Sequence, residues 1–116
     1  SRVLLMDLSL IQSELDSFAD ERDWGQFHSV RNLVLALVGE AGEIAELFQW
    51  IDDSKVSNFL DEGGRERLGE ELADVLFVLT CIANQTGINL DDAMKNNFDK
   101  KTRRDAKRHI ENDKLK

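Results

Sequence analysis

Two pairs of acidic residues at helical spacing are the part of this sequence best suited to chemistry. Glu40 and Glu43 stand three residues apart, and so do Glu71 and Asp74. Residues three apart lie on one side of an α-helix, so each pair can direct two carboxylates toward a shared ion. Hard divalent cations prefer oxygen ligands and keep waters that phosphate oxygens can displace. The four residues therefore predict a site for Mg²⁺, with Mn²⁺ as a substitute, that acts on phosphate groups.

The surroundings of these carboxylates strengthen that interpretation. An isolated pair of acidic residues on a helix is usually a solvated surface feature. Here Glu40 falls on the apolar stripe of its helix, and Glu71 and Asp74 flank Leu72 and Val75. Burying several uncompensated charges is very costly, and a bound metal removes that cost.

Two other kinds of metal site fit the sequence less well. Di-iron carboxylate bundles use Glu-x-x-His elements, and neither His28 nor His109 stands three residues after a glutamate. The lone Cys81 has no companion cysteine with which to form a zinc site. Ligation by oxygen alone favours magnesium and phosphate chemistry.

Helical periodicity dominates the chain, which contains no proline and no tyrosine. The spacing predicts helices over 8–22, 31–52, 65–86 and from 90 onward, separated by a loop at 23–29, a polar linker at 52–64 and a turn at Gly87. Asn89 is expected to cap the last helix, whose predicted buried face comprises Leu90, Ala93, Met94 and Phe98. We therefore expect an all-α, four-helix bundle in which the second and third helices are antiparallel and bring the acidic pairs together.

Size and charge limit the possible partners. A chain of 116 residues fits one domain, 1–116, with a core at about 8–104, and pairing with another copy would bury further surface. A net charge of −8 argues against a nucleic-acid partner. No apolar stretch approaches the roughly 18 residues of a membrane span, so no membrane partner is expected. One cysteine allows no internal disulfide, and we expect a cytoplasmic protein.

Several motifs together resemble one known family. They are Arg22-Asp23-Trp24, Gln26-Phe27-His28, Arg31-Asn32-Leu33, Ala36-Leu37-Val38-Gly39-Glu40, Ala45-Glu46-Leu47-Phe48-Gln49-Trp50 and Glu70-Glu71-Leu72-Ala73-Asp74-Val75-Leu76. This set is similar to the MazG-like all-α nucleoside triphosphate pyrophosphatases, and within them to the dCTP pyrophosphatase branch. The resemblance covers about residues 8–104.

The resemblance carries implications for the site and the assembly. The family's metal signature, Glu-x-x-Glu followed by Glu-x-x-Asp, maps onto Glu40, Glu43, Glu71 and Asp74. Positions matching Trp24 and Trp50 line the base and sugar pocket in dCTP-preferring members, and the position of His28 faces the nucleotide. The family assembles as homodimers or homotetramers with sites near the subunit interface, so a homo-oligomer is implied here.

The fourth helix departs from the family pattern. A Lys, Asn, Arg and Tyr-Pro pattern is usual near its end, whereas this chain reads Asn97-Phe98-Asp99-Lys100-Lys101-Thr102-Arg103-Arg104-Asp105. Basic residues that bind phosphate cannot be assigned one by one, and Lys100, Lys101 and Arg104 are nominated as a group. A solvated basic face at a helix C-terminus explains them equally well.

The resulting hypothesis is hydrolysis of a nucleoside triphosphate, with dCTP preferred, to the monophosphate and pyrophosphate. Glu43 and Glu71 are the predicted catalytic residues, with Glu43 as the general base for a water that attacks the α-phosphorus. One alternative is hydrolysis of dUTP or of modified nucleotides, because stacking alone discriminates poorly between bases. Another is a non-catalytic helical module whose acidic residues only set oligomer contacts.

Overall fold

The computed structural model describes residues 6–22 and 29–111. Within these ranges it contains five α-helices and no strand. The helices are α1 (Leu8–Glu21), α2 (Val30–Phe48), α3 (Val56–Phe59), α4 (Arg65–Thr86) and α5 (Leu90–Glu111). The predicted all-α class is confirmed, and the four long helices match the four expected from periodicity.

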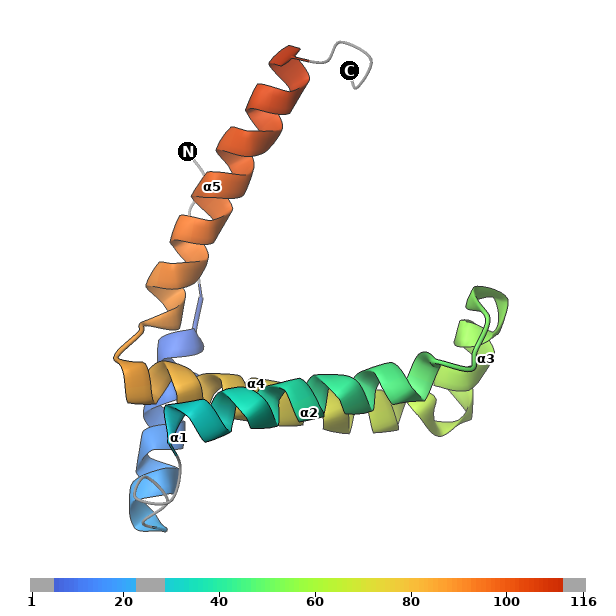
Figure 1. Ribbon diagram of the computed structural model, residues 1–116, viewed down its shortest axis with the longest axis horizontal. Coiled ribbons are helices and arrows are strands. Elements are labelled where there is room, and N and C mark those ends of the chain that lie inside the picture. The colour runs from blue at the N-terminus through green and yellow to red at the C-terminus, as the bar shows by residue number, and fades with distance from the viewer. Residues whose placement is uncertain (1–5, 23–28, 112–116) are drawn as a thin grey trace.

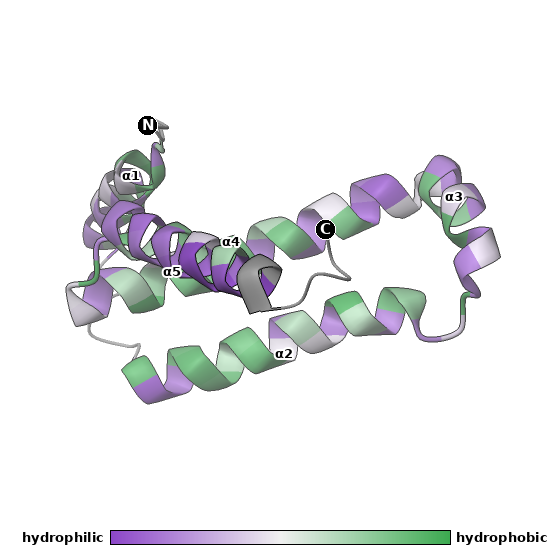
Figure 2. Cartoon of the chain, turned by 90° about the horizontal axis from the view of Figure 1, so that it is seen from above, coloured by the Kyte–Doolittle hydropathy of each residue, from purple (hydrophilic) through white to green (hydrophobic). Residues whose placement is uncertain are grey.

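The centre of the fold is an antiparallel pair formed by α2 and α4 (Figure 1). The view in Figure 2 shows the two helices running side by side, with α1 and α5 gathered at one end. The Phe18 ring of α1 meets the Phe77 ring of α4 edge to face, with centroids 6.2 Å apart. Leu15, Leu33 and Ala83 are the buried apolar residues among those described, so the core of one chain is small.

The segment between α2 and α4 differs from the predicted polar linker because it is largely helical. A 3₁₀ turn (Asp53–Lys55), α3 and a π-helical turn (Leu60–Gly64) follow one another. The Phe59 ring packs against Phe48 at the end of α2, with centroids 5.4 Å apart. A side chain at Gly64 would collide with the backbone and ring of Phe59, so this close approach requires glycine.

The corner between α4 and α5 is a sharp turn built on Gly87, as the sequence predicts. Gly87 adopts the left-handed conformation at φ 70°, and the Ile88 N–H donates to the Ala83 carbonyl at 2.9 Å. The predicted Asn89 cap is confirmed, because its Oδ1 accepts from the Asp92 N–H at 3.0 Å. Beyond this corner α5 leaves at a bend of 102°.

Gln12 of α1 bridges α4, the turn and α5. Its Nε2 donates to Asn84 Oδ1 at 3.0 Å and to the Ile88 carbonyl at 2.8 Å. Its Oε1 accepts from the Leu90 N–H at 2.9 Å, which satisfies one of the free N–H groups at the start of α5. One side chain therefore ties three elements together at the corner.

Asp91 of α5 caps the start of α1. Asp7 occupies the N-cap position but makes no side-chain cap hydrogen bond. The Asp91 carboxylate instead accepts from the Leu8 N–H at 3.0 Å, the Ser9 N–H at 3.3 Å and the Ser9 hydroxyl at 2.6 Å. The Ser9 hydroxyl, followed by the two N–H groups, holds the pKa of Asp91 below its usual value of 3.8.

Replacing Asp91 with alanine is expected to lower the melting temperature by roughly 5 °C, because α1 loses its cap. Because its pKa is lowered in the folded state, the Asp91 carboxylate stabilises the fold at pH values above its ordinary pKa. This stabilisation is lost as the pH falls through the folded-state pKa. The difference between the parent chain and Asp91→Ala should therefore shrink below about pH 3.8. Thermal melts followed by circular dichroism at several pH values measure this difference in melting temperature. A difference that grows in acid would contradict the capping role of Asp91.

The expected buried face of α5 is wrong in part for the single chain. Met94 is 36% exposed and Phe98 is 39% exposed, because α5 projects away from the α2–α4 pair (Figure 1). Among the described residues, no single helix is long and apolar enough to cross a membrane. The helical segments on either side of Gly87, Asp53–Thr86 and Leu90–Arg108, meet the criteria of length and composition only as a bent pair.

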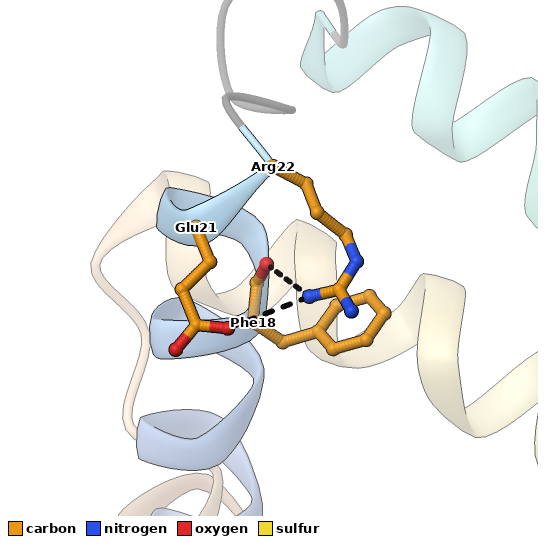
Figure 3. A network of polar contacts seen from close by, with 3 residues as sticks. All are labelled: Phe18, Glu21 and Arg22. Carbon is orange, nitrogen blue, oxygen red and sulfur yellow. Dashed lines mark hydrogen bonds and ion pairs between the residues drawn. The ribbon is translucent and has the colours of Figure 1, made fainter.

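The end of α1 is held by contacts of Arg22 with the preceding turn (Figure 3). Its guanidinium donates to the Phe18 carbonyl at 3.2 Å and lies 3.6 Å from the centroid of the Phe18 ring. An ion pair with Glu21 adds a contact of 3.6 Å at the surface. The next residues, 23–28, include the predicted site residues Trp24 and His28 and lie outside the described residues.

Candidate metal centre

The fold brings together all four predicted metal ligands. Glu40 and Glu43 come from the middle of α2, and Glu71 and Asp74 come from the facing stretch of α4. One carboxylate oxygen from each residue lies within 4.8 Å of the others. Ser29 fixes the start of α2 by accepting from the Asn32 N–H at 3.0 Å, and antiparallel packing then sets the two pairs face to face. Four carboxylates this close form a cluster that can bind a divalent metal ion.

Two carboxylate oxygens in this cluster lack partners. Glu40 Oε2 and Glu71 Oε2 are buried and accept no hydrogen bond from any described residue. Glu40 and Glu71 are half-buried, whereas Glu43 and Asp74 are exposed. A buried acceptor without a donor is costly, and an incoming cation removes that cost. The donor set of four carboxylates and the two unpartnered oxygens therefore fit a divalent cation.

Contact with neighbouring carboxyl groups and burial together shift the protonation of the half-buried pair. The adjacent Glu43 carboxyl group, followed by burial, raises the pKa of Glu71 to about 7. Burial, followed by the charges of Glu43 and Asp74, raises the pKa of Glu40 above its usual 4.5. Without a cation the cluster therefore holds protons more tightly than ordinary glutamates do.

A pocket of about 240 Å³ lies one helical turn from the carboxylates. It opens where α1 crosses the α2–α4 pair, and Ala36 and Val78 stand four residues from Glu40 and Asp74. Its walls are mainly apolar, with polar groups from α1 and α4. Its lining includes Leu15, Asp16, Leu33, Phe77, Cys81 and Gln85.

The remaining predicted site residues in the described part of the chain lie apart from this centre. Trp50 follows α2 at the end opposite the pocket, and it is 88% exposed. Lys100, Lys101 and Arg104 are exposed on α5, which projects away from the carboxylates (Figure 1). Within one chain, neither the tryptophan nor the basic group meets the pocket.

Sequence reasoning missed the polar lining of the pocket. Asp16 and Gln85 sit on helices whose acidic and amide residues look like ordinary solvated positions. They line the pocket only because α1 crosses the pair at this point. Helical periodicity contains no information on that crossing.

Comparison with known proteins agrees with this arrangement. The MazG nucleotide pyrophosphohydrolase domain matches residues 28–109. The chain is 43% identical over 105 residues to dCTP pyrophosphatase 1 of Bos taurus, covering 90% of this chain and 60% of the relative. It is 45% identical over 101 residues to dCTP pyrophosphatase 1 of Homo sapiens, covering 86% and 58%. The chain thus spans about 60% of the length of these curated relatives.

A solved structure has the same fold. The crystal structure of a pyrophosphatase from Archaeoglobus fulgidus DSM 4304 superposes with a TM-score of 0.73 at 28% sequence identity. The match covers 90% of this chain and 96% of the archaeal one. The matched domain contains both acidic pairs, and the structural match extends over nearly the whole chain. The chain belongs to the MazG nucleotide pyrophosphohydrolase family.

Proposed function

We propose that this protein is a Mg²⁺-dependent pyrophosphohydrolase that converts a nucleoside triphosphate, preferably dCTP, to the monophosphate and pyrophosphate. The observation that carries the proposal is the cluster of four carboxylates with two buried, unpartnered oxygens. Its position one helical turn from an apolar pocket supports a substrate with charged phosphates at one end and a planar, largely apolar base at the other. The relatives named dCTP pyrophosphatase 1 support the choice of substrate.

Each carboxylate has a role in this proposal. Glu40, Glu43, Glu71 and Asp74 hold the metal, which when bound neutralises phosphate charge and lowers the pKa of water. Glu43 is exposed at the edge of the cluster, where it can accept a proton from the attacking water. Glu40 and Glu71 are more enclosed, so they fix the position of the site. No covalent intermediate with the protein is required.

The pocket is suited to a single-ring base. Its volume of about 240 Å³ is below the roughly 300–1,000 Å³ of sites for larger ligands. Phe77 and Leu33 provide apolar walls, while Asp16 and Gln85 provide an acceptor and an amide. A carboxylate accepts from the exocyclic amino group of cytosine, which uracil lacks. This chemistry favours dCTP over the alternative substrate dUTP.

Asp16→Asn is expected to lower the preference for dCTP over dUTP by about tenfold, because the amide can either accept from the cytosine amino group or donate to the O4 atom of uracil. The quantity to measure is kcat/KM for both nucleotides. Glu14→Gln on the same helix, outside this pocket, is the matched control and should leave the ratio unchanged. An unchanged ratio in Asp16→Asn would remove the base-reading role from this residue.

The proposed activity is tested by measuring pyrophosphate release from a panel of canonical and modified nucleoside triphosphates with and without Mg²⁺. Metal-dependent release that favours dCTP supports the proposal. No turnover of any nucleotide would favour the other reading, a non-catalytic helical module.

A homo-oligomer is part of the proposal, because one chain leaves much apolar surface uncovered. Its radius of gyration is 18.4 Å, against about 13 Å for a compact chain of this length. On α2, Leu33 and Leu37 face the fold, whereas Leu35 is 57% and Val38 is 67% exposed. A helix that is apolar on both sides is normally buried on both sides. A second copy covering this face of α2 supports the expected homodimer or homotetramer.

A further inference from the structure

The pocket beside the carboxylate cluster is acidic on the side formed by α1. Asp16 and Asp20 both line it, and their spacing of four residues places them on one side of α1. None of the other described residues that line the pocket is basic. Both carboxylates are exposed, and neither has an ion-pair partner in the described part of the chain. Two negative charges therefore stand at this pocket without a described cation to balance them.

The negative potential reaches the wall that α4 contributes to the pocket. Cys81 of α4 lines the same pocket, and burial, followed by the charge of Asp16, raises the pKa of its thiol. Arg22, the first basic residue after Asp20 in the sequence, is engaged with Phe18 and Glu21 and is not among the described residues that line the pocket. A ligand in this pocket is therefore attracted more strongly if it carries a positive charge.

A neutral cytosine base leaves this charge unbalanced. Its exocyclic amino group can donate a hydrogen bond to Asp16, but it brings no charge, so both carboxylates remain fully negative. A cytosine alkylated at N3 keeps the amino group and carries a positive charge at neutral pH. Such a base makes the same hydrogen bond with both partners ionised, and Asp20 adds a second attraction. The pair of carboxylates thus matches a cationic pyrimidine better than a neutral one.

We propose that the pocket selects pyrimidine nucleotides whose base is positively charged, so that the protein hydrolyses N3-methyl-dCTP in preference to dCTP. The inference rests on the proposed function for the reaction. Water bonds to the α-phosphorus, the bond from that phosphorus to the bridging oxygen breaks, and pyrophosphate leaves with the electron pair. dCTP is then the preferred substrate among canonical nucleotides, and its N3-alkylated derivative is a better one. The additional substrate class is nucleotides damaged by alkylation.

The test compares kcat/KM for dCTP, N3-methyl-dCTP, dUTP and N3-methyl-dUTP in the presence of Mg²⁺. N3-methyl-dUTP carries the same methyl group on a neutral base, so it separates the effect of charge from that of shape. The parent chain should hydrolyse N3-methyl-dCTP about tenfold more efficiently than dCTP. Methylation of dUTP should give no such gain. A parent chain that prefers dCTP to its methylated form, or gains equally from methylation of both bases, would overturn the proposal.

Two variants locate the effect on α1. Asp20→Asn should lower the preference for N3-methyl-dCTP over dCTP severalfold, because one of the two charges is lost. Glu14→Gln removes a charge from the same helix outside this pocket, so it should leave the preference unchanged. Added salt should also reduce the preference of the parent chain, because exposed charges are screened. A preference that Asp20→Asn leaves intact would show that the acidic pair does not read the charge of the base.

A binding measurement separates failure of this inference from failure of the proposed function. Calorimetry with 2′-deoxycytidine and with N3-methyl-2′-deoxycytidine reports on the pocket without phosphates, metal or hydrolysis. The methylated nucleoside should bind more tightly to the parent chain, and Asp20→Asn should reduce the difference. If the parent chain hydrolyses no nucleotide, the proposed function fails and binding decides the inference. Tighter binding of the methylated nucleoside would then support the charged pocket, whereas equal affinities or no detectable binding would overturn it.

Discussion

Replacing Glu71 with glutamine is expected to reduce pyrophosphate release by roughly 1,000-fold and, in the absence of metal, to raise the melting temperature. The loss of activity follows because one of four ligands to the metal is gone, and bound metal contributes several kcal/mol to such reactions. The gain in stability follows because Glu71 is half-buried beside Glu43, and its charge opposes folding when no cation is present.

The sign of the stability change depends on pH. A glutamate whose folded-state pKa is raised to about 7 costs stability as pH rises from its ordinary value of 4.5 through 7. The metal-free parent chain should therefore melt at a lower temperature at pH 8 than at pH 5.5, and Glu71→Gln should show a smaller difference. Mg²⁺ should raise the melting temperature of the parent chain at pH 8 and have little effect on the variant.

The matched control for this experiment is Glu66→Gln. Glu66 is an exposed acidic residue on α4 and is not part of the carboxylate cluster. Activity, metal response and pH dependence should all remain at parent levels. A Glu71→Gln variant that melts lower than the parent chain without metal would show that the carboxylates are compensated within the protein. The cluster would then be stable without a bound cation, contrary to the proposal.

Replacing Val38 with aspartate is expected to dissociate the oligomer. Val38 is 67% exposed on the face of α2 turned away from α4, next to the exposed Val34 and Leu35. If a second copy covers this face, the substitution buries an unpaired charge at the interface, which is among the most costly single changes. Light scattering should report a smaller particle, and the melting temperature should fall by about 10 °C or more, because the small core of one chain must then stand alone.

Asn58→Asp is the control for the added charge. Asn58 is exposed on α3, outside the apolar face of α2, so the mass in solution and the melting temperature should not change. If the active site also depends on a second copy, Val38→Asp should lower the enzymatic activity as well as the mass of the particle in solution. A parent chain that is monomeric at micromolar concentration would contradict the proposed assembly directly.

Much of the fold follows from local pattern. The four long helices and the Asn89 cap match the prediction, because periodicity, caps and the Gly87 turn are all encoded within a few residues. The predicted linker between α2 and α4 is present, but it is largely helical, because the packing of Phe59 against Phe48 and the close approach at Gly64 stabilise helical turns there. Contacts between separate segments determine the structure of this linker, and the polarity of the local sequence does not indicate those contacts.

The candidate metal centre could be predicted for a similar reason. Spacing of three fixes each acidic pair on one side of its helix, and a short connection makes α2 and α4 antiparallel neighbours. The four carboxylates then meet without any knowledge of the rest of the fold. The two unpartnered oxygens, by contrast, depend on burial in the assembled pair.

Residue type and spacing along the chain are therefore enough to predict the helical class, the acidic pairs and the resemblance to the MazG family. Three other features arise in the folded chain alone: α1 crosses the α2–α4 pair to form a pocket, Gln12 and Asp91 hold the corner, and α5 leaves at a bend of 102°. These features depend on hydrogen bonds between residues about 80 positions apart and on packing between helices. Such contacts leave no periodic signal in the chain, although they decide which residues one site can contain.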